Sequence, residues 1–284
     1  MPYQVAKTSY GNVSYRRTGY GQRKILFFHG FPGSSCQIDI FKPELQSQDL
    51  DVVCFDRPGY HHTEIKTVDS LDVTVKIAME IISALSWNQF EIVTVSGGTP
   101  FGVALATQYP KTVTGIRIIS GLGDLTVNSV RKNFPIVSIF GLKVLPFVPA
   151  KVIKNALQIK SGKRNPVIDF FLPPSKADYE LGLNKHVRDS LNQSLSEALE
   201  HGFLGPKQDT IAFLANWSAG AGNLKIPVHF WHGDMDNVIS YKISESMAPL
   251  FPNGKMTLVK NQGHLSLPIT LIGQILKFDF ASQS

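Results

Sequence analysis

The serine at position 96 stands where an apolar, β-branched run ends and a helical pattern begins. Gly97 and Gly98 follow it directly, and an apolar segment at 101–106 comes next. The pattern predicts a buried strand, a tight turn at Ser96 and then a helix, which is a setting that exposes a serine as a nucleophile. Small neighbours let the strand and the helix approach each other, although Thr94 stands two residues before the serine, where glycine is commoner.

A serine hydroxyl attacks well only when a base takes its proton and a third group orients that base. We expect the base to be His264, which follows a glycine after the apolar run at 255–259. We expect the acid to be Asp236, which follows the preceding run. Asp124 and then Asp234 are the alternatives, since each also follows a predicted strand, and the carboxyl ends of parallel strands meet at one edge of a sheet.

An attacked carbonyl develops negative charge on its oxygen, and this charge needs fixed hydrogen-bond donors. The residue after the nucleophile, Gly97, offers one backbone N–H. Phe31 offers the other, because it lies in the glycine-rich loop at 29–33 that follows an early apolar run. Two further histidines, His61 and His62, follow the turn at 56–59, and an adjacent pair there is more often solvated than part of a pocket.

Strand and helix patterns alternate along most of the chain. A hairpin is predicted over 4–17, strands at 24–28, 51–55, 90–95, 113–119, 227–231 and 255–259, and helices at 38–45, 70–85, 100–109 and 268–280. Continuously apolar strands that alternate with helices predict an α/β fold with a mostly parallel sheet covered on both faces. The alternation stops between the strands at 113–119 and 227–231. We therefore expect a core at 1–124 and 225–284, interrupted by a helical cap at 125–224.

The composition is that of a globular protein, with 43% hydrophobic and 18% charged residues. The net charge is +6 and the pI about 9.2, but no nucleic-acid-binding motif accompanies this excess. We predict no membrane span and no secretory signal in the polar first 23 residues. Cys36 and Cys54 stand in no redox or metal spacing, so we expect a cytoplasmic protein without a metal or an organic cofactor.

Five short motifs carry a resemblance that covers nearly the whole chain outside the cap. In order, they are His29-Gly30-Phe31-Pro32-Gly33, Asp56-Arg57-Pro58-Gly59-Tyr60, Val95-Ser96-Gly97-Gly98, His232-Gly233-Asp234-Met235-Asp236 and Gly263-His264. The chain resembles the α/β-hydrolase superfamily. The resemblance implies the α/β-hydrolase fold, with Ser96 as nucleophile, Asp236 as acid, His264 as base, and Phe31 and Gly97 as oxyanion donors. It also implies no aspartate nucleophile of the kind that haloalkane dehalogenases and epoxide hydrolases of this fold use.

The function expected from this resemblance is that of a carboxylesterase-like serine hydrolase acting on a small-molecule acyl substrate. Cleavage of a lactone, amide or carbon–carbon bond, cofactor-free perhydrolysis, and a ligand receptor with little turnover are the alternatives. The cap segment at 134–157 is strongly apolar and interleaved with lysines, which suits a lipophilic pocket wall or contact with a membrane surface. The residues expected to line the pocket are His29, Phe140, Phe147 and Trp217.

Overall fold

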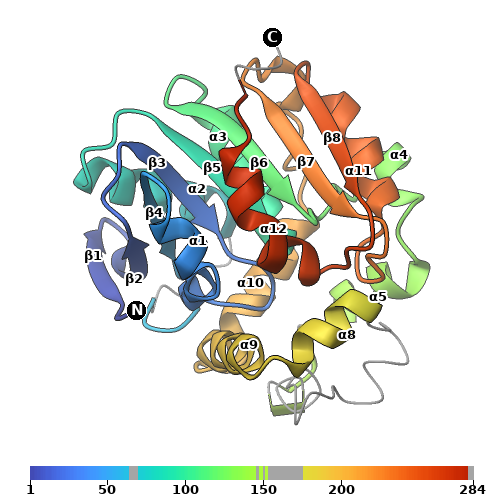
Figure 1. Ribbon diagram of the computed structural model, residues 1–284, viewed down its shortest axis with the longest axis horizontal. Coiled ribbons are helices and arrows are strands. Elements are labelled where there is room, and N and C mark those ends of the chain that lie inside the picture. Colours follow the sequence, from blue (N-terminus) through green and yellow to red (C-terminus); the bar gives the residue numbers. More distant parts are fainter. Residues whose placement is uncertain (64–69, 145–146, 150, 153–174, 281–284) are drawn as a thin grey trace.

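The computed structural model describes residues 1–63, 70–144, 147–149, 151–152 and 175–280 (Figure 1). Its centre is an eight-stranded sheet in the order β1-β2-β4-β3-β5-β6-β7-β8. The strands are β1 (Gln4–Thr8), β2 (Gly11–Thr18), β3 (Arg23–Phe28), β4 (Leu50–Phe55), β5 (Phe90–Val95), β6 (Val113–Ile119), β7 (Val228–Gly233) and β8 (Gly254–Val259). β2 pairs antiparallel with β1 and β4, and the remaining neighbours are parallel. The predicted α/β fold, its edge hairpin and its strands are confirmed.

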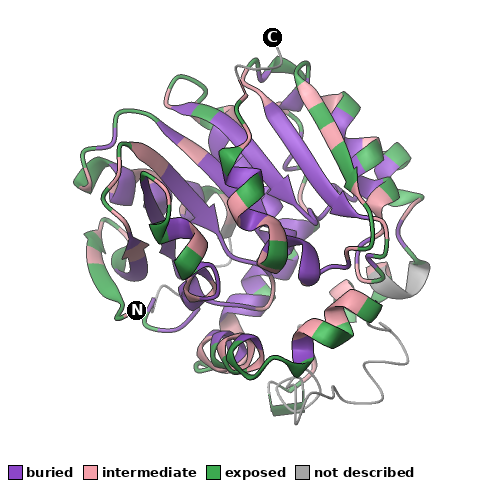
Figure 2. Ribbon diagram, in the orientation of Figure 1, coloured by how far each residue is buried: buried purple, intermediate pink, exposed green. Residues whose placement is uncertain are grey.

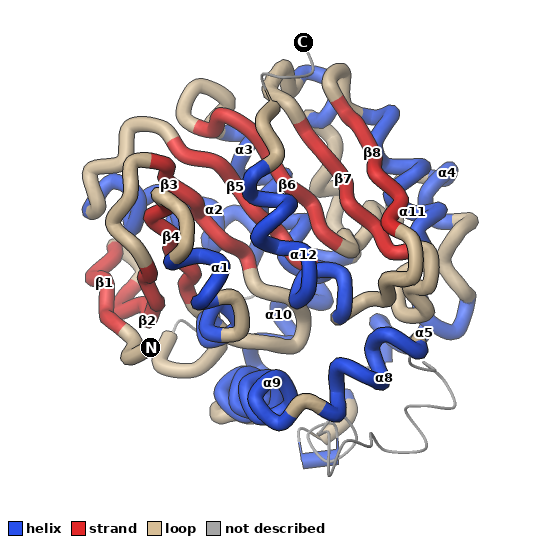
Figure 3. The backbone as a smooth tube through the Cα atoms, in the orientation of Figure 1, coloured by secondary structure: helices blue, strands red, loops and turns tan. Residues whose placement is uncertain are grey.

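Helices cover both faces of this sheet (Figure 3). The helices within the described ranges are η1 (Ser35–Asp39), α1 (Lys42–Gln46), α2 (Ser70–Ala84), η2 (Ser96–Gly98), α3 (Thr99–Gln108), α4 (Asn128–Arg131), α5 (Ile136–Val144), α8 (Lys176–Leu183), α9 (Lys185–Ala198), α10 (Leu204–Phe213), η4 (Ala221–Asn223), α11 (Tyr241–Met247), η5 (Ala248–Leu250) and α12 (Ser266–Lys277). The single helix expected at 38–45 is instead two short helices. Pro43 lies in the first turn of α1, a position where proline starts a helix rather than continuing one.

Alternate residues of the central strands face two separate hydrophobic cores. On β3, Leu26 and Phe28 pack with α2 and α3, whereas Ile25 and Phe27 pack with α1 and α12. Successive side chains of a strand point to opposite faces, so a strand covered on both sides is apolar throughout. Figure 2 shows the resulting buried centre of the sheet.

The helices α4 to α10 connect β6 to β7, where the sequence predicted a helical cap. Figure 1 shows α8 and α9 beyond the carboxyl ends of the parallel strands. The predicted boundaries of 1–124, 125–224 and 225–284 stay a prediction, and part of the cap lies outside the described residues.

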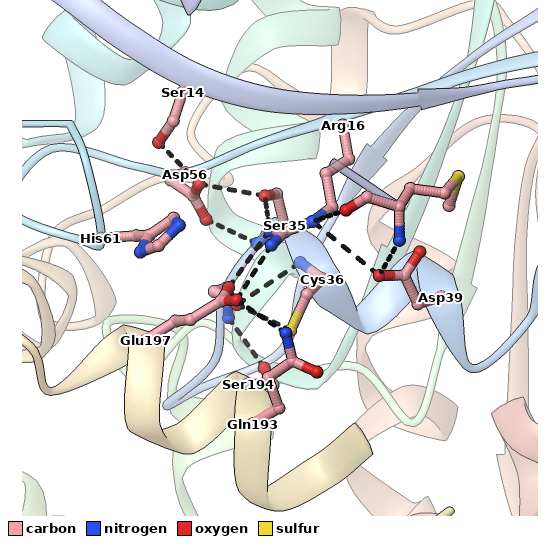
Figure 4. Close-up of polar contacts among 12 residues, drawn as sticks. Ser14, Arg16, Ser35, Cys36, Asp39, Asp56, His61, Gln193, Ser194 and Glu197 are labelled. Carbon is pink, nitrogen blue, oxygen red and sulfur yellow. Dashed lines mark hydrogen bonds and ion pairs between the residues drawn. The ribbon is translucent and has the colours of Figure 1, made fainter. Parts of the chain in front are cut away.

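Two ion pairs fasten this helical segment to the core. The Arg57 guanidinium binds the carboxylate of Asp209 on α10, with Nη2 2.5 Å from Oδ2, and both side chains are almost fully buried. The Arg16 guanidinium on β2 binds Glu197 on α9 with both terminal nitrogens, at 3.1 and 2.9 Å (Figure 4). Removing one partner of a buried pair typically costs about 3–5 kcal/mol, since the other charge is then left unpaired. These pairs therefore fix α9 and α10 relative to the sheet.

Candidate active site

Ser96 lies at a sharp turn between β5 and α3. Its backbone is left-handed, with φ of 51°, a conformation that residues other than glycine rarely adopt. A Cβ at Gly98 would come 2.4 Å from the carbonyl oxygen of Phe28, so only glycine fits beside β3. The unexpected Thr94 is accommodated by Gly102, where an added Cβ would meet the threonine methyl at 2.4 Å. The turn thus tolerates a β-branched residue on the strand because the facing helix has no side chain there.

The structure brings the three residues predicted to act together into one hydrogen-bonded row. His264 Nε2 lies 3.0 Å from Ser96 Oγ, and His264 Nδ1 lies 2.7 Å from Asp236 Oδ2. All three residues are buried, each with at most 8% of its surface exposed. The row has the order nucleophile, base and acid that general-base activation of a hydroxyl requires.

Asp236 is held as an ion by its surroundings. Burial alone would raise the pKa of its carboxyl, but the adjacent His264 and hydrogen bonds from His232 and His264 outweigh burial and bring that pKa well below its ordinary value. Its second oxygen, Oδ1, accepts the backbone N–H groups of Val238 and Ile239 at 2.9 and 2.8 Å. Asp236 is therefore equipped to orient the imidazole and to balance a positive charge on it.

Two residues that position the site, His232 and Asp178, were not predicted from the sequence. The first is His232 on β7, whose Nε2 lies 3.0 Å from Asp236 Oδ2 and 2.8 Å from the carbonyl oxygen of Ile239. Since a carbonyl only accepts, Nε2 carries the proton, and Nδ1 is left to accept the Ser244 hydroxyl at 2.7 Å. His232 stands four residues before Asp236, and this spacing is the sequence feature that could have indicated the contact.

The second positioning residue is Asp178 on α8. Its carboxylate accepts the backbone N–H groups of His264, Leu265 and Ser266 at 2.9, 3.0 and 2.7 Å. A carboxylate at the first turn of α12 satisfies donors that have no partner within the helix. It also explains Gly263, where a Cβ would come 2.4 Å from Asp178 Oδ2. No local sequence pattern links residues so far apart in the chain.

The two alternative acids bind elsewhere. Asp124 accepts the backbone N–H and the hydroxyl of both Thr126 and Ser218, at distances of 2.6 to 2.9 Å. Asp234 accepts the N–H of Asn261 at 2.8 Å and pairs with Lys260 at 3.5 Å. Both carboxylates stabilise loops, and the geometry favours Asp236 over either as the partner of His264.

A cavity of about 130 Å³ opens beside Ser96. Its wall is mostly apolar and includes Leu191 from α9; the lining residues are Gly30, Phe31, Pro32, Gln37, Ile40, Phe41, Val95, Ser96, Leu191, His264, Leu265, Pro268 and Ile269. Gly97 lies directly against Phe31, since a Cβ on Gly97 would come 2.5 Å from the Cβ of Phe31. The two residues expected to supply oxyanion donors are therefore neighbours, and Phe31 lines this cavity.

None of the four residues predicted to line the pocket is among the residues that line this cavity, and their place in a pocket stays a prediction. Phe140 and Phe147 are 66% and 82% exposed, whereas Trp217 is only 3% exposed and packs in the main core. His29 is fully buried under the loop that it begins, where burial and the nearby Arg57 hold its pKa well below the ordinary value. An apolar side chain in a helical segment thus proved a poor guide to which surface it faces.

Residues 24–138 match the family described as the alpha/beta hydrolase fold. The solved structures of a bromoperoxidase from Bacillus anthracis and an esterase from Thermogutta terrifontis both superpose with a TM-score of 0.68. Their identities are 16% and 15%, over 99% and 98% of this chain and 98% and 97% of theirs. The chain therefore has the α/β-hydrolase fold. An epoxide hydrolase of Vigna radiata shares the fold too, with a TM-score of 0.66 and 19% identity over 98% of both chains.

Two curated proteins of similar sequence are named as uncharacterized hydrolases. One is from Bacillus subtilis, 27% identical over 112 residues, and the other from Saccharomyces cerevisiae, 33% identical over 110 residues. The matches cover 39% and 37% of this chain, and equally about two fifths of the length of each relative. Within the described ranges, no helix combines the length and the apolar character that a bilayer crossing needs.

Proposed function

We propose that this protein is a serine hydrolase that cleaves small carboxylic esters through an acyl-enzyme on Ser96. The observation that carries the proposal is the unbroken row from Ser96 Oγ through His264 to Asp236 Oδ2, with spacings of 3.0 and 2.7 Å, beside an apolar cavity. The fold and the names of the relatives support hydrolase activity. Among the possible reactions, ester cleavage requires the fewest catalytic groups beyond these three residues.

In the proposed reaction, Ser96 Oγ attacks the ester carbonyl carbon while its proton passes to His264 Nε2. The carbonyl oxygen becomes an oxyanion, which the N–H groups of Phe31 and Gly97 stabilise. The bond to the alkoxide leaving group then breaks, and that group takes the proton from His264. A water molecule attacks the acyl-enzyme by the same route, with His264 as base, and the acid product leaves with Ser96 reprotonated. Asp236 stays ionised throughout and balances the imidazolium.

The cavity limits the acyl group. At about 130 Å³ it is close in size to an engineered protein cavity of about 150 Å³ that accommodates benzene. Apolar walls from Ile40, Phe41 and Leu191 favour a short alkyl or a small aromatic acyl group. Longer chains would have to displace Leu191 and the helix that carries it.

We expect the rate of ester hydrolysis to fall with acyl length. For p-nitrophenyl acetate, butyrate, octanoate and palmitate, kcat/KM should be highest for one of the two short esters and at least about 10-fold lower for palmitate. A methylene that does not fit a pocket is worth roughly 1–3 kcal/mol in discrimination. Leu191→Ala, which enlarges the cavity, should shift the preference toward longer chains, whereas Leu183→Ala on exposed α8 should not.

The same assay separates an enzyme from a ligand receptor on this fold. An enzyme releases many equivalents of p-nitrophenol per protein at a steady rate. A single equivalent followed by almost no further release would support the receptor, and inactivity toward all four esters would move the proposal to an amide, lactone or carbon–carbon bond.

A further inference from the structure

Away from the cavity, two histidines and a glutamate gather at the junction between the core and the segment that follows α9. His61 and His62 belong to the loop after β4, and Glu200 follows α9. One ligand atom from each of the three lies within 4.8 Å of the other two. His61 is buried, with its Nδ1 2.8 Å from a carboxylate oxygen of Glu200, whereas His62 and Glu200 are exposed.

The local backbone explains why adjacent histidines share one side of the chain. His61 is left-handed, with φ of 43°, so the chain turns between the two residues instead of sending their side chains to opposite faces. Their ring centroids lie 4.0 Å apart. The Tyr3 ring packs on both, at 5.3 Å from His61 and 4.5 Å from His62. This packing limits the freedom of the imidazoles before any ligand binds.

A second contact fixes the glutamate side of the cluster. His201, the residue after Glu200, directs its Nε2 to the carbonyl oxygen of His61. Because a carbonyl can only accept, this nitrogen donates its proton, and the turn after α9 is thereby tied to the backbone of His61. On the buried side, Nε2 of His61 has no hydrogen-bond partner among the described residues. Among these residues, the ring is therefore held by a hydrogen bond at Nδ1 alone.

Two imidazoles and a carboxylate are a ligand set of borderline softness that suits Zn²⁺ and similar transition metals, and not Mg²⁺, which prefers oxygen ligands and bound water. In a tetrahedral zinc site, neighbouring donor atoms lie about 3.3 Å apart, given Zn–N and Zn–O bonds of about 2.0–2.1 Å. Zinc binding would draw these donor atoms closer than their present spacing of up to 4.8 Å, through movement of the two exposed side chains, His62 and Glu200.

We propose that His61, His62 and Glu200 bind one divalent transition-metal ion of the zinc type, which clamps the end of α9 to the loop after β4. The same helix carries Leu191 in the cavity wall and Glu197 in the ion pair with Arg16 (Figure 4). Metal at this junction adds a further tie between the end of α9 and the core, beside the Arg16–Glu197 ion pair. Its effect is therefore on the stability of the folded chain, and it takes no part in the reaction at Ser96.

The test is titration of the full, tag-free chain with ZnCl₂ by isothermal calorimetry, with MgCl₂ in parallel. We expect saturable one-to-one binding of Zn²⁺ and none of Mg²⁺. His62→Gln and Glu200→Gln each remove one ligand from an exposed side chain, and each should weaken zinc binding by at least about 10-fold. Zinc at about 100 times its Kd should raise the Tm of the unaltered chain by about 5 °C, and that of either variant by much less.

His186→Gln is the matched control, because His186 is also exposed and lies at the other end of α9, outside the cluster. It should bind zinc as tightly as the unaltered chain. No saturable zinc binding, or binding that both ligand variants retain in full, would overturn the proposal and leave His61 and Glu200 as an ordinary ion pair.

Discussion

Replacing Ser96 with alanine is expected to lower kcat for p-nitrophenyl acetate by roughly 10⁴- to 10⁶-fold. The substitution removes the atom that forms the acyl-enzyme, and what activity remains comes from binding and oxyanion stabilisation alone. Alanine has the same Cβ as serine, so it occupies the left-handed backbone at this position with the same strain. The expected loss is therefore one of chemistry and not of folding, which steady-state kinetics and a thermal melt measure side by side.

Ser120→Ala is the matched control for this variant. Ser120 directly follows the neighbouring strand β6, is fully buried and has a left-handed backbone with φ of 48°, but its hydroxyl has no hydrogen-bond partner among the described residues. It should keep nearly full turnover. Equal loss in both variants would show that buried serines at this sheet edge support the fold, and would remove the reason for assigning Ser96 the attack.

Asp236→Asn is expected to lower kcat by about 10⁴-fold while the chain stays folded. Asparagine keeps the shape of the side chain but presents an amide, so it cannot balance the charge that His264 gains when it takes the serine proton. His232 donates its Nε2 proton to Asp236 Oδ2 at 3.0 Å. If the amide nitrogen of the introduced asparagine took the place of this oxygen, its N–H groups would face the N–H of His232. The measurement is kcat against pH for the variant and the unaltered chain.

The competing carboxylates supply the controls. Asp234→Asn, two residues away and bonded to Asn261, should leave kcat within about 3-fold, since its carboxylate is not part of the row. Asp124→Asn should lower the Tm, because its carboxylate holds Thr126 and Ser218, but it should leave kcat largely intact. A 10⁴-fold loss in Asp124→Asn with an active Asp236→Asn would reverse the assignment of the acid.

The sheet was predictable because its signals are local. Continuous apolar runs at β3, β4 and β5 indicated strands buried on both faces. The residues that follow β5, β7 and β8 gave Ser96, Asp236 and His264 as neighbours at one edge of the sheet. The positions of these residues relative to each other follow from the parallel order of the strands. No knowledge of side-chain packing was needed.

The residues around the site could not be predicted, because they depend on contacts between segments that are distant in the sequence. Asp178 reaches the amide of His264 across 86 residues of sequence, and nothing near either residue indicates the contact. Thr94 departs from the commoner glycine, and its accommodation rests on Gly102 across the helix interface. The residues that line a cavity were hard to predict for a related reason: Phe140 and Trp217 are both apolar and aromatic, but one is 66% exposed and the other is buried. Hydrophobicity indicates that a residue favours burial, and not which surface covers it.

Reaction with diethyl p-nitrophenyl phosphate shows directly whether Ser96 is the nucleophile. We expect release of one equivalent of p-nitrophenol and a gain in intact mass of one diethylphosphoryl group. Peptide mapping should locate that group on Ser96, and the Ser96→Ala variant should gain no such group. A phosphoryl group on a different residue, or none at all in a chain that still hydrolyses p-nitrophenyl acetate, would contradict the account.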